Sequence, residues 1–346
     1  MSKLQDEAMR VIRDRLAPLV PYMQDDSVTE IMINSHGNYF IESRGNMSRV
    51  NVSLSPNAID AAIRAVMTIN SKDTSYIMDA RLPGFRIACA MPPVAVHGPM
   101  MTIRKHSRIR YSLQDYVEQG SFDRKSGGRH AEHGEDTESP ESIAQHGGVR
   151  LARFLKWAVR SRKNILIAGG TGSGKTTLLS ACLMEIPENE RIITCEDTNE
   201  ITLSQPNIVQ FEAYSPPGGS PITIRDLVRL CLRSRPDRIV VGEIRGQEAY
   251  DFLDAMNTGH SGSLCTIHAD SAFLALRRLE SLIRMSPTAA NLPLRDMRAS
   301  IASAINYVIY QARDGAVRAP EQIIALDGIT EDGDYKWRKI YDRHET

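Results

Sequence analysis

The chain has 346 residues, which is enough for two domains that each bury a hydrophobic core. Lys plus Arg and Asp plus Glu number 42 each, so the net charge of zero gives no general reason to expect nucleic-acid binding. The five cysteines form no C-x-x-C pair, so we expect buried free thiols. No secretory signal is visible, and no apolar run has the length of a membrane span. We therefore expect a cytoplasmic chain whose membrane contact is at most peripheral.

The first 120 residues predict an N-terminal α+β domain. A helix with one apolar stripe is expected over 4–20, and a second one carries Ile59, Ile63, Val66 and Met67 on one face. Short alternating segments separated by glycine-containing turns predict an antiparallel meander, and further extended segments follow. The expected strands are 29–34, 38–42, 48–52, 76–80, 85–91 and 100–105. Ser112 caps a short helix that ends before Gly120.

The composition changes at Gly120. Residues 121–148 contain five glycines, three histidines, six acids and almost no apolar side chains. Such a segment cannot bury enough surface to order itself, so we interpret 121–149 as a flexible linker. Its histidines, His130, His133 and His146, have no predicted rigid scaffold, which favours a solvated linker over a metal site.

From residue 150 onward the chain alternates strands with helices. This pattern predicts a parallel sheet covered by helices on both faces. The expected strands are 164–168, 191–195, 208–211, 238–241 and 263–267, and the expected helices are 150–160, 175–185, 223–234, 246–257, 270–285 and 293–312. Two β-like segments, 322–326 and 335–341, predict a terminal hairpin that turns at 331–334.

Residues 169–176 match the pattern G-x-x-x-x-G-K-[ST], the phosphate-binding loop of nucleotide hydrolases. A predicted buried strand precedes this loop and a predicted helix follows it, as the motif requires. The glycines let backbone N–H groups turn toward phosphate oxygens, and the helix N-terminus attracts the anion. We expect Lys175 to reach the β- and γ-phosphates of ATP and the Thr176 hydroxyl to bind Mg²⁺. The expected nucleotide-binding residues are Gly169, Gly170, Thr171, Gly172, Ser173, Gly174, Lys175, Thr176 and Thr177.

Carboxylates for the metal and for hydrolysis are expected at the ends of two other strands. The strand at 238–241 ends in Gly242 and Glu243, so a glycine stands where most such enzymes carry the metal-binding aspartate. Glu243 is suited to act on water, but the metal carboxylates must come from elsewhere. The turn after the strand at 191–195 carries Glu196, Asp197 and Glu200. It is either a solvated acidic turn or the site of a hydrated Mg²⁺, and the glycine at 242 favours the metal, with Thr176, Glu196 and Asp197 as ligands.

Two histidines, His260 and His268, flank the strand at 263–267. His268 closes this strand at the edge where ligands bind in parallel sheets. From spacing alone, a structural hydrogen-bonding role and a role at the nucleotide are equally compatible with these histidines.

Together, these motifs resemble the Walker A, Asp box, atypical Walker B and His box of the type II/type IV secretion traffic ATPases. The corresponding segments are 169–176, 196–200, 241–245 and 258–269, and the resemblance also reaches 28–34 and 81–86. It implies a RecA-like motor domain over 150–346, an N-terminal PAS-like domain over 1–120 and a homohexameric ring.

The resemblance also implies roles for individual residues. Glu243 would be the catalytic glutamate, Glu196, Asp197 and Glu200 would organise Mg²⁺ and water, and His260 and His268 would sense the γ-phosphate or couple it to movement. Arginines of the N-terminal domain contact the phosphates in this family, and Arg81, Arg86 and Arg104 stand at the corresponding positions. Guanidinium groups suit this task because they bind phosphate oxygens in a bidentate way. The implied catalytic residues are Lys175, Glu196, Glu243, His268, Arg86 and Arg104, with Arg81 binding the nucleotide.

The branch of the family is indicated by the His box and the cysteines. No cysteine follows Cys265, whereas the type II branch usually carries a four-cysteine zinc insert after the His box. The eight-residue step from His260 to His268 looks more like the type IV secretion and conjugation ATPases. The resemblance therefore implies a hexameric ATPase, peripheral to the bacterial inner membrane, that powers conjugative pilus assembly or substrate transfer together with inner-membrane secretion or pilus assembly proteins.

Three alternative functions are compatible with the sequence. A tight-adherence or type IV pilus assembly ATPase is the nearest, and a DNA-translocating RecA-like ATPase is the second. The neutral charge and the lack of a base-stacking aromatic platform argue against the second, and no direct sequence-specific nucleic-acid binding is expected. A regulatory switch that binds nucleotide without turnover is the third, and Glu243 argues against it.

Overall fold

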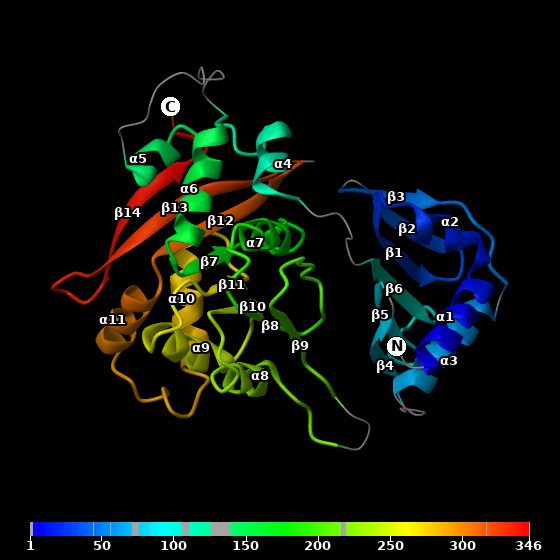
Figure 1. The fold of residues 1–346 in the computed structure, drawn as a ribbon. Helices are drawn as coiled ribbons and strands as arrows, with labels where there is room; N and C mark the ends of the chain where they lie inside the picture. The colour runs from blue at the N-terminus through cyan, green and yellow to red at the C-terminus, as the bar shows by residue number, and fades with distance from the viewer. Residues whose placement is uncertain are drawn as a thin grey trace. The chain divides into compact units, whose positions relative to one another are not determined.

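The computed structural model describes residues 3–43, 45–55, 57–70, 76–82, 84–105, 111–125, 139–215, 219–315 and 317–345. The chain forms two compact units (Figure 1). Unit 1 consists of Met1–Arg108 with Pro216–Ser220, and unit 2 consists of Ile109–Ser215 with Pro221–Thr346.

Unit 1 contains a six-stranded antiparallel sheet in the order β3-β2-β1-β6-β5-β4. Its strands are β1 (Val28–Ser35), β2 (Asn38–Ser43), β3 (Asn46–Val50), β4 (Ile77–Leu82), β5 (Phe85–Ala90) and β6 (Met100–Lys105). Its helices are α1 (Lys3–Arg15), the 3₁₀ turn η1 (Ala17–Leu19), α2 (Val20–Gln24) and α3 (Ala58–Asn70). The α+β prediction and all six predicted strands are confirmed.

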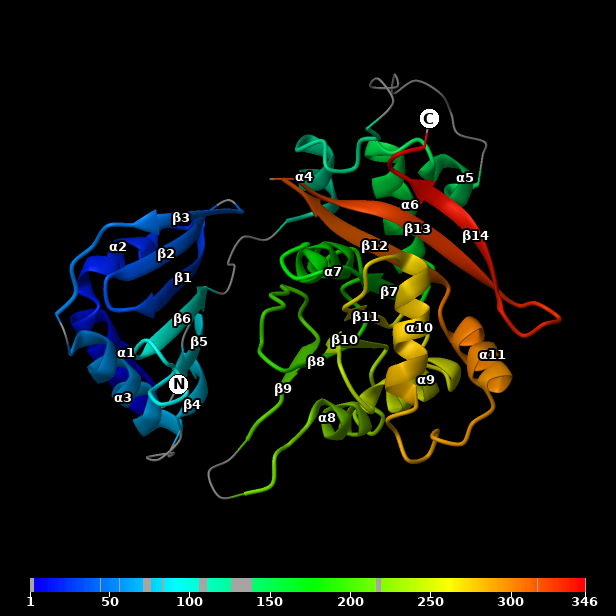
Figure 2. The same cartoon turned by 180° about the vertical axis from the view of Figure 1, so that it is seen from behind.

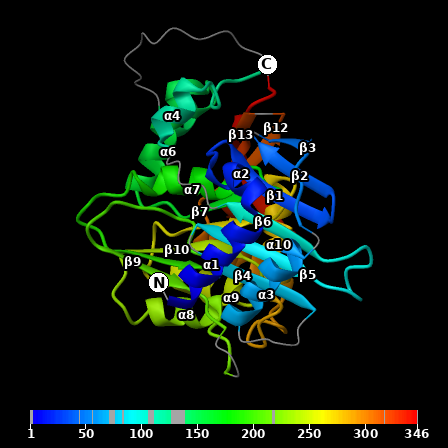
Figure 3. The same ribbon diagram turned by 90° about the vertical axis from the view of Figure 1, so that its right-hand side faces the viewer.

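The core of unit 1 lies on one face of this sheet. Alternate strand residues such as Ile31, Ile87 and Ile103 are fully buried, together with Ile12 of α1 and Ile63 of α3. Figure 3 shows α1 and α3 side by side along the strands. Because side chains alternate between the two faces of a strand, residues 30, 86 and 104 project from the opposite face.

Unit 2 is built on an eight-stranded sheet in the order β14-β13-β12-β7-β11-β10-β8-β9. The strands are β7 (Ile165–Ala168), β8 (Ile192–Glu196), β9 (Ile208–Glu212), β10 (Arg238–Ile244), β11 (Leu264–Ile267), β12 (Tyr307–Asp314), β13 (Val317–Ile329) and β14 (Tyr335–Asp342). Strands β7 to β12 pair in parallel, whereas β13 and β14 are antiparallel to their neighbours. The predicted mostly parallel sheet is confirmed.

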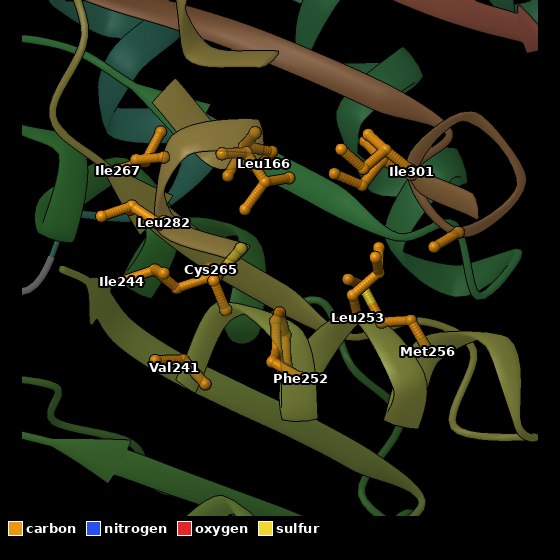
Figure 4. Packing of buried hydrophobic residues seen from close by; sticks show 14 of the residues in the cluster. Leu166, Val241, Ile244, Phe252, Leu253, Met256, Cys265, Ile267, Leu282 and Ile301 are labelled. Carbon is orange, nitrogen blue, oxygen red and sulfur yellow. The ribbon is translucent and has the colours of Figure 1, made fainter. Parts of the chain in front are cut away.

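Helices cover both faces of this sheet (Figures 1 and 2). One face packs against α4 (Leu113–Glu118), α6 (Gly148–Arg160) and α7 (Lys175–Leu183). The other packs against α8 (Ile224–Cys231), α9 (Glu248–Asn257), α10 (Ala272–Ile283) and α11 (Leu294–Ala304). Figure 4 shows this second layer, in which Phe252 and Leu282 meet Val241 and Cys265 of the strands. Burial on both faces explains why the parallel strands read as continuous apolar runs.

Two predicted helices were too long. The expected helix 4–20 ends at Arg15 and is followed by η1, with Pro18 in that turn, and α2. The expected helix 293–312 ends at Ala304, and β12 begins at Tyr307 and pairs in parallel with β7. Apolar residues at 297, 301, 305 and 308 continue the helical spacing, and a short apolar run cannot be assigned to helix or strand by spacing alone. The place beside β7 favours the strand, since Val308 and Ile309 are fully buried there.

The expected boundary at residue 120 and the expected linker 121–149 also need correction. Unit 1 ends at Arg108, and α4 packs on α6 and α7 in unit 2. Phe122 is fully buried and stacks on Tyr116, and α5 (Pro140–Ala144) lies against α6. A few apolar residues among polar ones are enough to anchor these stretches. Residues 126–138 of the expected linker, with His130 and His133, lie outside the described residues.

The cysteine expectation is confirmed, because Cys89, Cys182, Cys195, Cys231 and Cys265 are all buried and free. None of the helices in the described parts of the chain combines the length and the apolar character that a membrane crossing requires.

Candidate active site

The phosphate-binding loop connects β7 to α7, as predicted. Gly172 and Gly174 adopt positive φ angles of 70° and 87°. A Cβ on Gly169 would lie 2.2 Å from the backbone oxygen of Gln311. Glycine is required at these three positions by conformation or by space.

The side chains of the loop are held in place by the loop itself. Lys175 is buried, and its Nζ donates to the carbonyl oxygens of Gly169 at 2.9 Å and Gly170 at 2.8 Å. Ser173 Oγ also donates to the Gly170 oxygen, at 2.9 Å. Thr171 is exposed, whereas Thr176 and Thr177 are half-buried in the first turn of α7. The lysine ammonium is therefore kept at the loop, where an incoming phosphate is able to replace its carbonyl partners.

Glu196 ends β8 and is almost completely buried. Its Oε1 accepts hydrogen bonds from the backbone N–H groups of Glu200 at 3.1 Å and Ile201 at 3.0 Å. A Cβ on Gly242 would lie 2.9 Å from Cγ of Glu196. The glycine that replaces the usual aspartate is thus the residue that makes room for Glu196. Burial raises the pKa of this carboxyl group from 4.5 to about 7, and the two backbone hydrogen bonds oppose the rise.

This shift predicts a pH-dependent effect of Glu196→Gln. The folded-state pKa lies above the unfolded one, so wild-type stability decreases as the pH rises from about 4.5 to 7 and stays reduced above it. The neutral variant escapes this cost, which is at most roughly 3 kcal/mol. In thermal unfolding without nucleotide or metal, Glu196→Gln should exceed wild type at pH 8 and match it near pH 4, below the unfolded-state pKa. Exposed Glu188→Gln serves as the control. If the difference in unfolding midpoint between Glu196→Gln and wild type is the same at both pH values, the raised pKa of Glu196 is contradicted.

Glu243 lies in a bulge of β10. The pairing of β10 with β11 shifts between Val241 and Ile244, which leaves one extra residue on β10. Bulges turn side chains in new directions and are frequent beside active sites. Thr266 Oγ1 of β11 donates to the backbone oxygen of Gly242 at 2.6 Å and so ties the bulge to the sheet.

One cation holds the Glu243 carboxylate, and an imidazole lies next to it. Nη2 of Arg245 donates to Oε2 at 2.6 Å. Nε2 of His268 lies 3.0 Å from Oε1, which has no hydrogen-bond partner among the described residues. Arg245 also reaches Asp197 Oδ2 at 3.2 Å with its Nη1. The Glu243 carboxylate raises the pKa of the Arg245 guanidinium. Arg245 was in a recognised motif but had no predicted role, because nothing in the sequence reveals that it joins two carboxylates from neighbouring strands.

The two histidines lie at opposite ends of β11. Ile267, next to His268, pairs with Ala168 at the loop end of β7, whereas Leu264 at the other end pairs with Ile165. His260 precedes Leu264, and its Nδ1 lies 3.2 Å from the backbone oxygen of Ala255. His260 therefore supports the end of α9 and lies away from the loop end of β7, and its role in sensing the γ-phosphate or coupling it to movement stays a prediction. The structure does bring His268 to Glu243.

The expected Mg²⁺ ligands offer oxygen atoms, but their side chains do not converge on one point. Thr176, Glu196 and Asp197 all present oxygen atoms, which Mg²⁺ prefers. Among the described residues, no three His, Cys, Asp or Glu side chains converge as a metal site. Glu196 is engaged with backbone N–H groups and Asp197 with Arg245. This arrangement fits a Mg²⁺ held mainly by phosphate oxygens and water, with few direct protein ligands.

The arginines predicted in unit 1 lie on adjacent strands. Arg86 and Arg104 are directly opposite each other on β5 and β6, so their side chains share the face that the helices leave uncovered. Arg86 makes a bidentate pair with Asp79 at 2.7 and 3.2 Å, and Arg104 lies 3.8 Å from Glu30. Arg81 is the backbone partner of Arg86 on β4, and its side chain is outside the described part of the structure. Two guanidinium groups on one face of neighbouring strands, those of Arg86 and Arg104, suit an anionic ligand.

The β12–β13 hairpin contributes residues beside the phosphate-binding loop that the sequence did not predict. Arg318 Nε donates to the backbone oxygen of Gly172 at 2.9 Å, and Gln311 is fully buried next to Gly169 and Gly174. These contacts join residues about 140 positions apart, so no local pattern could have revealed them.

The fold and the site define a nucleotide-binding protein of the P-loop class with a RecA-like core. Residues 144–314 match the family model described as "Type II/IV secretion system protein". The chain is 33% identical over 333 residues to the type IV secretion system protein VirB11 of Bartonella quintana (strain Toulouse), covering 89% of this chain and 91% of that protein. It is 32% identical over 329 residues to the conjugal transfer protein TrbB of Rhizobium radiobacter, covering 92% and 90%.

The fold is also similar to that of the ATPase DotB of Legionella pneumophila. That structure is 19% identical in sequence, covers 93% of this chain and 78% of the DotB chain, and has a TM-score of 0.56. The chain belongs to the type II/type IV secretion ATPase family, and its relatives in sequence are VirB11 and conjugal transfer proteins. The predicted family and its type IV secretion branch are confirmed.

Proposed function

We propose that this chain hydrolyses ATP in the presence of Mg²⁺ and thereby powers substrate transfer or pilus assembly through a type IV secretion system. The observation that carries the proposal is the position of Glu243. Glu243 lies at the sheet edge that also carries Lys175. The bulge in β10 redirects its side chain, which lies between His268 and Arg245. A loop that only binds nucleotide needs no such carboxylate.

In the proposed reaction, the loop backbone and Lys175 bind the β- and γ-phosphates of ATP. Glu243 orients the attacking water and accepts a proton from it, while Arg245 keeps the carboxylate in place and His268 lies beside it. Mg²⁺, when bound, neutralises phosphate charge. Thr176, Glu196 and Asp197 would hold it, directly or through water.

Arg86 and Arg104, with Arg81, supply further positive charge to the phosphates in this proposal. The ion pairs of Arg86 with Asp79 and of Arg104 with Glu30 are partly exposed and therefore weak. A phosphate is thus able to compete for these two guanidinium groups. Hydrolysis would then be coupled to movement of unit 1 relative to unit 2.

Neutralising these arginines tests the role of unit 1. Arg86→Gln and Arg104→Gln should each reduce the rate of phosphate release by about 10- to 100-fold, since each removes a charge that stabilises the transferred phosphoryl group. Arg64→Gln is the matched control, because Arg64 is exposed on α3, and α3 covers the opposite face of the unit 1 sheet from Arg86 and Arg104. A double Arg86→Gln/Arg104→Gln variant that keeps the wild-type rate would rule out this role.

The names of the relatives favour secretion and conjugation as the process served. We propose that the chain works as a homohexamer, peripheral to the inner membrane, with inner-membrane secretion or pilus assembly proteins as partners and without direct sequence-specific DNA binding. Affinity purification of the full chain from its own cells should yield such membrane proteins. ATPase stimulation by single-stranded DNA with a steep salt dependence would instead favour a DNA translocase.

A further inference from the structure

The β12–β13 hairpin presents a polar face to the phosphate-binding loop. Arg313 of β12 is directly opposite Arg318 of β13, and Gln311 is two residues before Arg313 on the same strand. Opposed residues share a face, and so do alternate residues of one strand. Gln311, Arg313 and Arg318 therefore project to the same side of the hairpin.

This face is in contact with the glycines of the loop. A Cβ on Gly174 would lie 3.0 Å from Cδ of Arg318 and 3.6 Å from Nε2 of Gln311. A Cβ on Gly172 would lie 3.7 Å from Nη1 of Arg313. The aliphatic part of Arg318 thus packs on Gly174, while its Nε donates to the Gly172 oxygen at 2.9 Å.

Two features of this contact cost free energy in the structure without nucleotide. Arginines that face each other directly across a ladder repel. Gln311 is fully buried, and neither amide atom of its side chain has a hydrogen-bond partner among the described residues. Buried amides are normally paired with protein or ordered water, so the Gln311 side chain has hydrogen-bonding capacity left beside two guanidinium groups and the loop.

The Gly172 oxygen and the Ser173 N–H belong to one planar peptide group and point in opposite directions. By holding the oxygen toward the hairpin, Arg318 turns the Ser173 N–H to the inside of the loop. There it now meets the Gly170 oxygen at 3.4 Å, a long hydrogen bond that a phosphate oxygen is able to replace.

We propose that Arg318 is a positioning residue for nucleotide binding, which orients the Gly172–Ser173 peptide so that its N–H group binds a phosphate shared by ATP and ADP. The inference rests on the proposed function, because it concerns the same loop. It gives the C-terminal hairpin, which lies on the side of β7 away from Glu243 and Glu196, a part in the nucleotide site.

Nucleotide titration of the full-length chain tests this role. Arg318→Met keeps the stem that packs on Gly174 but removes the donor. It should weaken the binding of both ATP and ADP by about tenfold, the effect expected for one hydrogen bond to a charged group. It should also raise KM for ATP with little change in kcat. Arg318→Lys, which retains a donor, should recover part of the affinity. Exposed Arg278→Ala on α10 is the control.

A purely structural role would lower the unfolding midpoint of the nucleotide-free protein and leave Kd and KM unchanged, and this result would overturn the inference. A loss for ATP much larger than for ADP, or a fall in kcat alone, would also overturn it, because Arg318 would then act on the γ-phosphate or the transition state. If Lys175→Ala hydrolyses ATP normally, the proposed function fails; if only the Arg318 variants behave as wild type, only this inference fails.

Discussion

Replacing Lys175 with alanine is expected to reduce ATP hydrolysis by about 10³-fold and to weaken ATP binding strongly. The ammonium is buried at the loop and now bonds to the Gly169 and Gly170 oxygens at 2.9 and 2.8 Å. A bound triphosphate would take over this charge in a site with little water, where one ionic contact to the phosphoryl group has a large effect on the rate. Phosphate release and nucleotide titration measure the two effects separately.

Lys336→Ala is the matched control for this variant, since Lys336 is exposed on β14. It should leave both quantities unchanged. Full ATPase activity in Lys175→Ala would mean that the loop is not the site of hydrolysis.

Replacing Glu243 with glutamine is expected to separate binding from turnover. The amide cannot accept a proton from water, so phosphate release should fall by about 10²- to 10⁴-fold. ATP affinity should change little, because the side chain is held by Arg245 and not by the loop. Single-turnover phosphate release and nucleotide titration on the same preparation give both numbers.

Glu188→Gln, at an exposed position outside the site, controls for removal of one negative charge. A Glu243→Gln variant that still turns over at the wild-type rate would move the catalytic role to another carboxylate, with Glu196 the first to be tested. Loss of ATP binding together with turnover would mean that Glu243 supports the loop and does not act on water.

The phosphate-binding loop could be predicted from the sequence because its geometry depends on local glycines. Positive φ angles at Gly172 and Gly174 follow from a short segment whose residue types leave few alternatives. The parallel sheet was also predictable, since burial of both faces produces continuous apolar strands.

The remaining features depend on contacts between distant segments. Strand β12 was mistaken for the end of a helix, because its apolar residues also fit a helical spacing and only its place beside β7 decides. The position of His260 follows from the direction of β11, and the pairing of Arg245 with Asp197 and Glu243 follows from the order of β8 and β10. The anchoring of residues 111–125 in unit 2 rests on a few side chains, such as Phe122, that composition does not distinguish.

We expect this chain to turn over ATP and not merely to bind it. Steady-state phosphate release by the purified full-length protein, with ATP and Mg²⁺, measures this turnover. We predict continuous release over many turnovers that stops on chelation of Mg²⁺. Tight ATP binding with no release beyond the background of the Lys175→Ala variant would rule out hydrolysis and identify a nucleotide switch.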